Sequence, residues 1–334
     1  MSDRFNQLLR TVGLVVGLVV TAAVGWILFV RIPGDLADLL GVVLVLLTVI
    51  GGFRLMNRLL ETLLPRYNVA EVAVEGPITR NGSGGPLPAR PGGTAADAIV
   101  EQIERADEDR HAKGLVVRLN TPGGEVVPSD DIRRAVEAFD GPTVAYTTDR
   151  CASGGYWIAS GCDQLVARDA SLVGSIGVLG SRVTAHELLD RVGLSYEQLT
   201  AGEYKDAGVP LKELSDQDRQ YLQGLIDGFY ETFIDRVTDG RELEEAAVRD
   251  TEARVYLGEE AAEIGLVDAL GDQDDATAYL ADELGIESAT VEEFEPSRPL
   301  RDRLQSGVAG VAYAFGAGIA GVVDDGQQFR FELR

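Results

Sequence analysis

The first part of the chain carries two long apolar runs. Residues 11–30 contain no charged side chain, and residues 36–53 are interrupted only by Asp38. A helix needs about twenty mostly apolar residues in succession to cross a bilayer. Residues 31–35, between the runs, have the composition of a tight turn. The pattern predicts a transmembrane helical hairpin, and with it a membrane anchor over residues 1–66.

The arginines around the two runs give an expected orientation. Only Arg31 lies between the runs, whereas two arginines precede the first run and three follow the second (Arg4, Arg10, Arg54, Arg58 and Arg66). The positive-inside bias therefore predicts that both ends of the hairpin, and the domain that follows it, face the cytoplasm.

Short β-rich runs alternate with helical patterns over residues 67–290. The pattern predicts strands at 69–74, 114–120, 143–147 and 164–167, and helices at 94–109, 129–139, 153–160, 215–239 and 274–284. Alternation of this kind is typical of βαβ units, so we expect an α/β domain with a largely parallel sheet. The helix at 215–239 carries an apolar stripe that fits packing against the core or another subunit (Leu222, Leu225, Ile226, Phe229, Phe233 and Val237).

The tail, residues 291–334, contains a further uncharged segment at 306–323 that is dominated by glycine and alanine. Gly310, Ala314 and Gly318 recur every four residues, as on the close-packing face of a membrane helix. Because glycine and alanine gain little on entering lipid, a helix packed on the domain, a neighbouring subunit or the membrane surface is favoured over a third span.

Composition restricts the partners. The 334 residues include 54 acidic and 30 basic side chains, a net charge of −24, which argues against nucleic acid as a partner. Three lysines against 27 arginines, with the acids spread along the chain, are typical of adaptation to high salt, so we expect a halophilic archaeon as the source. Two cysteines form neither a disulfide framework nor a zinc site, and we expect no metal and no cofactor.

Ser153 is the candidate nucleophile, since it lies in a turn of small residues that opens an apolar helix. Cys151, two residues before it, is expected to be a buried packing residue of that turn. The chain offers two histidines and three lysines as the base (His111, His186, Lys113, Lys205 and Lys212). No motif surrounds either histidine, Lys113 and Lys212 lie in charged segments, and Lys205 follows Gly-Glu-Tyr.

A lysine acts as a base only when it is neutral, which burial favours and a close carboxylate opposes. Glu203 and Asp206 are near Lys205 in the sequence, so their side chains must point away from its amine. The loop at 120–124 directly follows a predicted strand, at the edge of the sheet where α/β ligand sites lie. Its two glycines allow backbone amides to approach a substrate oxygen, so this loop is a candidate oxyanion hole.

Together these segments resemble the membrane-bound signal peptide peptidases of the SppA type, serine proteases with a ClpP/crotonase-like fold of ββα repeats. The matching segments occur in order over residues 69–290, at 120–124, 153–156, 174–178, 202–206, and from 254–256 through 265–268. The resemblance implies Ser153 as nucleophile and Lys205 as general base. It also implies that the amides of Gly124 and Gly154 form the oxyanion hole and that Ser175 orients the lysine amine. The hairpin and the tail lie outside it.

The resemblance further implies a membrane-bound endopeptidase that cleaves remnant signal peptides or other short apolar peptides through an acyl-enzyme. Such enzymes form ring-shaped homo-oligomers. In bacterial members the catalytic domain lies outside the cytoplasm, whereas the arginines here predict the inside, so the membrane face stays open. Two alternatives remain, a non-catalytic protease-like scaffold and a crotonase-type acyl-CoA enzyme. Intact Ser153 and Lys205 argue against both.

Overall fold

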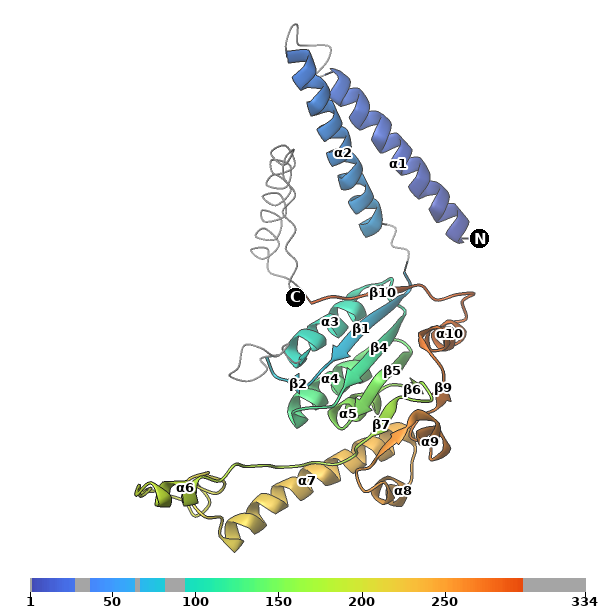
Figure 1. Cartoon of the computed structure of the whole chain (residues 1–334). Coiled ribbons are helices and arrows are strands. Elements are labelled where there is room, and N and C mark those ends of the chain that lie inside the picture. The colour runs from blue at the N-terminus through green and yellow to red at the C-terminus, as the bar shows by residue number, and fades with distance from the viewer. Residues whose placement is uncertain (1, 28–36, 64–66, 82–93, 297–334) are drawn as a thin grey trace, which may run out of the picture.

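The computed structural model describes residues 2–27, 37–63, 67–81 and 94–296 (Figure 1). Its first two helices, α1 (Ser2–Trp26) and α2 (Ala37–Leu63), run antiparallel and side by side. They approach closely at small residues, so that a Cβ on Gly52 would collide with Thr21. Among the described residues, no helix is long and apolar enough to cross a membrane. The spans predicted at 11–30 and 36–53 are therefore unconfirmed, and residues 28–36 lie outside the described part.

An eight-stranded, mostly parallel sheet forms the middle of the domain. Its main path follows the order β10 (Val291–Glu293), β1 (Val69–Glu75), β4 (Gly114–Thr121), β5 (Thr143–Ala152), β6 (Gln164–Ala167) and β9 (Ala269–Leu270), with every pair parallel. A branch runs from the end of β5 through β7 (Leu172–Gly174) to the antiparallel β8 (Val255–Leu257). A separate parallel pair joins β2 (Ile78–Thr79) and β3 (Thr94–Ala95). The expected α/β fold with a largely parallel sheet is confirmed.

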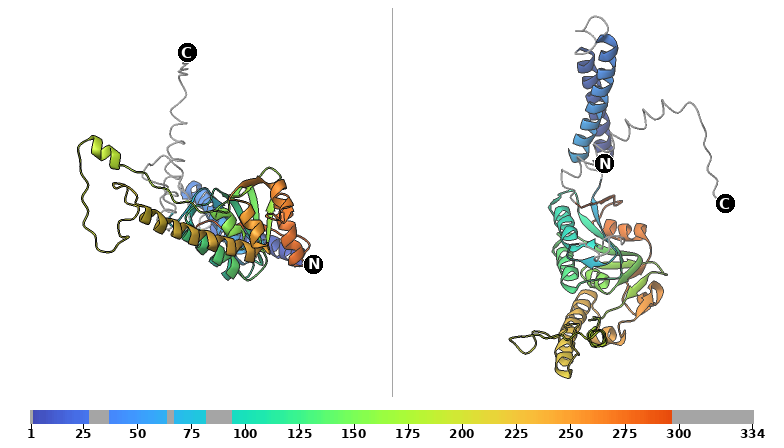
Figure 2. Two further views of the ribbon diagram at one scale, coloured as in Figure 1. Left: turned by 90° about the horizontal axis from the view of Figure 1, so that it is seen from below. Right: turned by 60° about the vertical axis from the view of Figure 1, so that its left-hand side comes forward.

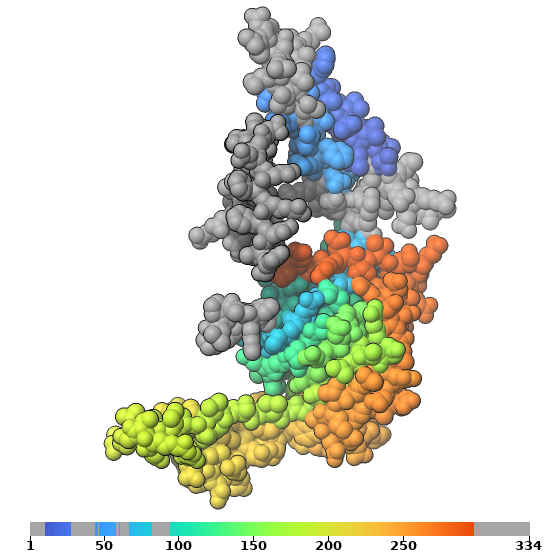
Figure 3. Space-filling view, in the orientation of Figure 1, coloured from blue at the N-terminus to red at the C-terminus, as the bar shows by residue number. Residues whose placement is uncertain are grey.

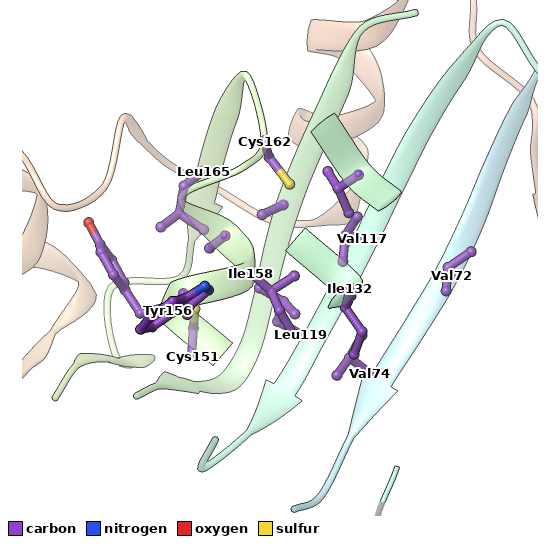
Figure 4. Packing of buried hydrophobic residues seen from close by; sticks show 14 of the residues in the cluster. Val72, Val74, Val117, Leu119, Ile132, Cys151, Tyr156, Ile158, Cys162 and Leu165 are labelled. Carbon is purple, nitrogen blue, oxygen red and sulfur yellow. The ribbon is translucent and has the colours of Figure 1, made fainter. Parts of the chain in front are cut away.

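Both faces of the sheet are buried, which explains why its strands read as continuous apolar runs. On one face, α3 (Ala96–Glu108), α4 (Val126–Ala138) and α5 (Gly154–Ala159) cover the larger core. Figure 4 shows part of this core, where Ile132 and Ile158 pack beside Val117 and Leu119 of β4. On the other face, α10 (Gln273–Glu283) covers the alternate residues of the central strands (Val69, Val116, Val144 and Val166).

A long excursion leaves the domain between β7 and α7 (Asp216–Arg241), and we call residues 183–214 the arm. Together with the N-terminal half of α7, the arm projects well beyond the sheet and contains α6 (His186–Arg191) (Figures 1, 2 and 3). Two hydrogen bonds tie its ends, from Arg182 Nη2 to the Lys212 carbonyl (2.9 Å) and from the Ala185 amide to the Pro210 carbonyl (2.9 Å). Seven large apolar side chains of the arm are exposed (Val183, Leu188, Val192, Leu194, Tyr196, Leu199 and Tyr204).

The apolar stripe predicted on the helix at 215–239, which is α7 in the structure, divides into two parts. Phe233 and Val237, in the C-terminal half, are buried in the domain core. Leu225 and Phe229, nearer the arm, are 47% and 41% exposed. Core packing therefore accounts for one part of the stripe and leaves the other uncovered.

The C-terminal part of the sheet includes segments that the pattern did not predict. Two short helices, α8 (Glu245–Asp250) and α9 (Gly258–Glu263), flank β8, and β10 adds an outer strand beside β1. The boundaries predicted at residues 66 and 290 stay predictions, and β10 continues the sheet to Glu293. The helix predicted at 306–323 lies outside the described residues.

Candidate active site

Three turns meet at the carboxyl edge of the sheet. Residues 122–124 follow the last residue of β4, Ser153 follows β5, and Ser175 follows β7. Strand register brings them together, because Thr121 pairs with Cys151, and Ala152 pairs with Gly174. The carboxyl edge of a parallel sheet is the usual place of an α/β ligand site.

The backbone at Ser153 is strained. Its φ is 53° and its ψ is −118°, outside the conformations that residues with a side chain normally adopt. Strain of this kind costs about 1–3 kcal/mol and persists only where the surroundings impose it. Here the buried strand β5 ends at Ala152 and the buried helix α5 begins at Gly154, which leaves one residue to make the turn. A sharp strand-to-helix turn of this type presents a nucleophilic hydroxyl.

The amides of Gly124 and Gly154 are free to bind an oxygen. The residues on either side of Gly124 pair with Ile78, which donates to the Gly123 carbonyl (3.0 Å) and accepts from the Glu125 amide (3.0 Å). The Gly124 amide therefore points to the opposite side. Gly154 is the first residue of α5, where amides have no partner within the helix. Within the described residues, neither amide donates a hydrogen bond.

Glycine is required at both positions by close backbone approach. A Cβ on Gly154 would lie 3.1 Å from the Gly124 nitrogen and would collide with the Ser129 hydroxyl. A Cβ on Gly124 would collide with the Ile78 carbonyl. The two loops that carry the predicted oxyanion hole are thus in direct contact beside Ser153.

We expect Gly154→Ala to lower kcat for the peptide cleavage that the resemblance implies by about 10²–10³-fold, the usual cost of a lost oxyanion-hole donor. The added methyl would push the Ser129 side chain and the Gly124 amide out of place. Steady-state kinetics on folded protein measures the effect. Gly51→Ala makes the same chemical change where a Cβ meets nothing within 4 Å, and should keep the parental kcat. Equal activity in both variants would contradict this account of the hole.

These groups line a pocket of about 810 Å³. Ser153, Ser175, Gly124 and Gly154 all face it, so the structure brings together four of the five predicted site residues. Its wall is largely apolar (Val126, Trp157, Val178, Ile226, Tyr230 and Phe233). A smaller cavity of about 590 Å³, at the start of β5 around Thr143 and Arg241, holds none of the predicted site residues.

A tight turn at 252–254, which the sequence analysis did not recognise as part of the site, closes one side of the pocket. Glu252 and Ala253 have φ of 48° and 56°, and the next residue, Arg254, accepts a hydrogen bond from the Ser175 amide (2.8 Å). Ser175 itself has a φ of 54°. The segment at 254–256, which begins with the last residue of this turn, was the available signal.

Lys205 is not brought to Ser153 within one copy of the chain. It is exposed, lies on the arm, and is absent from the lining of the Ser153 pocket. The remaining candidate bases do not face Ser153 either, since none of the described histidines or lysines lines that pocket. His111 pairs with Asp109 (3.0 Å), and Lys212 lies between two carboxylates.

Cys151 is buried in the core beneath the turn at Ser153, as expected for a packing residue. Burial raises the pKa of its thiol to about 12, so it is protonated near neutral pH. Cys162 is also a free, buried thiol whose pKa burial raises. Neither cysteine competes with Ser153 as a nucleophile.

Known proteins match large parts of this chain. The family model described as "Peptidase family S49" matches residues 138–287. A candidate protease of Synechocystis is 34% identical over 215 residues, which cover 63% of this chain and 77% of the relative. A candidate protease of Methanocaldococcus jannaschii is 30% identical over 223 residues, or 66% and 70% of the two chains. A candidate signal peptide peptidase SppA of Enterococcus faecium is 31% identical over 201 residues, or 59% and 58%.

These relatives favour neither the scaffold nor the acyl-CoA enzyme, and the predicted high-salt adaptation stays a prediction. The match to this family model and to these relatives agrees with the mostly parallel α/β sheet. The chain therefore belongs to peptidase family S49 and is a serine endopeptidase of the SppA type.

Proposed function

We propose that this endopeptidase cleaves short apolar peptides, remnant signal peptides among them, with Ser153 of one copy and Lys205 of a second copy. The observation that carries the proposal is the separation of the two residues. Ser153 lies at two free amides in an apolar pocket, whereas Lys205 is exposed on the arm. A homo-oligomer supplies what one copy lacks.

The fixed shape of the arm favours a second copy over a movement within one chain. Its two ends are joined by hydrogen bonds between residues 182 and 212 and between residues 185 and 210, and α7 continues directly from it. The exposed apolar side chains that the arm carries together are typical of an interaction site. When the arm of each copy contacts the pocket of the next, the copies form a closed ring if the rotation between neighbours returns to the first copy.

The proposed reaction is acyl transfer. The neutral amine of Lys205 takes the proton of the Ser153 hydroxyl as its oxygen bonds to the substrate carbonyl carbon. The amides of Gly124 and Gly154 hold the negative oxygen that results. When the C–N bond breaks, the lysine ammonium protonates the leaving amine. Water then hydrolyses the acyl-enzyme by the same proton transfers, and the Ser175 hydroxyl orients the lysine amine.

The pocket wall supports an apolar substrate. Trp157 and Phe233 are in tilted ring contact with centroids 4.7 Å apart, and together with Ile226 they give the pocket an apolar side. Pockets of this composition bind apolar side chains, while backbone groups fix the orientation of the substrate. The name of the Enterococcus faecium relative also refers to signal peptides.

We also propose that the two N-terminal helices attach the enzyme to membrane lipid. α1 exposes a run of large apolar side chains that no described part of the chain covers (Val12, Val15, Val16, Leu18, Val19 and Val20). A short apolar peptide left in a membrane would then be cleaved near where it lies.

A fluorophosphonate probe tests the nucleophile in the full-length protein. We expect one covalent label per chain, on Ser153, and no label on Ser153→Ala. Lys205→Ala should slow labelling by at least about a hundredfold, because general-base catalysis is lost. Ser288→Ala removes an exposed hydroxyl outside the pocket and should leave labelling unchanged. Labelling that survives Ser153→Ala would contradict the proposal.

A further inference from the structure

Two carboxylates flank Lys205, and each is held by another side chain. Asp206 Oδ2 lies 2.8 Å from the amine of Lys212, and Glu203 Oε1 accepts a hydrogen bond of 2.5 Å from Gln217. Lys212 also binds Asp218 Oδ2 (3.0 Å) at the start of α7. Within the described residues, Lys205 pairs with no carboxylate. Its neighbours in the sequence thus point to other partners.

The pairing matters because a free carboxylate beside an amine stabilises the charged ammonium. A lysine that takes a proton from serine must be neutral. The hydrogen bonds that the Lys212 amine donates to Asp206 and then to Asp218 raise the pKa of Lys212, so this lysine stays a cation and cannot act as the base. The pKa of Asp218 is lowered in turn, chiefly by its hydrogen bond to Lys212.

We propose that Lys212 is a positioning residue of the peptidase site, which holds Asp206 away from the amine of Lys205 and fixes the turn at 202–208 against α7. This inference rests on the proposed role of Lys205. The turn is fixed on a second side as well, since the rings of Tyr204 and Tyr221 stack with centroids 4.7 Å apart. Gln217 donates to the Tyr204 hydroxyl (3.1 Å) in addition to Glu203.

Several titratable groups lie around Lys205 on the arm or would be brought near it in the assembled site. The arm and the start of α7 contribute one set (Glu203, Tyr204, Asp206, Lys212, Asp218 and Tyr221). The pocket of the second copy contributes Asp227, Tyr230 and Glu252. The titratable groups of the pocket are the same in every arm variant. A change in the pH dependence of activity on substitution of Lys212 therefore reports on the arm.

The test is the pH dependence of kcat/KM for Lys212→Met in the full-length enzyme. We expect the acid limb to move to higher pH by about one unit, since the freed Asp206 carboxylate favours the charged form of Lys205. Activity should therefore fall near neutral pH and recover at higher pH. Lys212→Arg keeps a cation, so its acid limb should stay at the parental pH. Lys113→Met, the same change at an exposed lysine outside the pocket, is the matched control.

A second substitution separates this electrostatic role from a purely structural one. Adding Asp206→Asn to Lys212→Met removes the freed carboxylate and should return the acid limb to its parental position. The nearly buried Asp218 loses its cation in both variants, so both should have a lower Tm. Two results would overturn the inference. One is an acid limb of Lys212→Met at the parental pH, and the other is a loss of activity that is equal at every pH and that Asp206→Asn does not restore. Full activity of Lys205→Ala would instead overturn the proposed function.

Discussion

Ser153→Ala is expected to lower kcat for cleavage of a fluorogenic apolar peptide by about 10⁴-fold or more, the usual effect of removing a catalytic serine. The amide and carbonyl of Ser153 are held by Gly174 and Trp157, both at 2.9 Å, so the turn should keep its shape with alanine. The measurement is steady-state kinetics in high salt, with Tm and circular dichroism of both proteins.

The matched control is Ser288→Ala, which should retain parental kcat. Activity of Ser153→Ala within about tenfold of the parent would be incompatible with a serine nucleophile at this position. A large loss accompanied by a fall in Tm would require comparison with Ser153→Cys. That variant restores a nucleophile of similar size and should recover labelling by a thiol-reactive probe at the pocket.

Lys205→Ala is expected to be inactive to a similar degree, and to regain activity when mixed with Ser153→Ala. Each variant alone lacks one member of the pair. In a ring assembled at random from equal amounts, about a quarter of the sites would join an intact Ser153 to an intact Lys205 of the neighbouring copy. The reason is the position of Lys205, exposed on the arm and outside the pocket of its own chain. Coexpression of the two variants, followed by kinetics on the purified oligomer, measures the recovery.

A mixture as inactive as its components would show that both residues act from one chain, which would require the arm to fold back. Two copies of the same variant, coexpressed with different tags, control for assembly. If Lys205→Ala alone kept its activity, the base would have to be sought again, with His111 and His186 as the remaining candidates.

The central strands could be predicted because their signal is local. The run at 164–167 is buried on both faces and forms β6 with the predicted bounds. The strands that were missed are two or three residues long and depend on distant partners. β10 is an example, since it pairs with β1 across more than two hundred residues of sequence. Arg118 on β4, which binds Glu71, Glu75 and Glu293, holds these strands together and has no local signature.

The candidate site also contains a part that local sequence signals predict and a part that they do not. Ser153, Ser175 and the loop at 122–124 each follow the end of a parallel strand, so sequence order and topology are enough to gather them. The position of Lys205 depends on where the arm projects, and the residue pattern of the arm does not specify that direction. The left-handed turn at Glu252 and Ala253 was missed because neither residue type favours that conformation.

The burial of both cysteines makes the native chain unreactive toward maleimides. Cys151 and Cys162 are 0% and 3% exposed, and the high pKa of each thiol leaves almost no thiolate to react. A single cysteine introduced on the exposed surface of the arm would therefore be the only site that takes a fluorophore or spin label. The natural thiols need not be removed for such spectroscopy. The rate at which they become modified would measure how often the core unfolds.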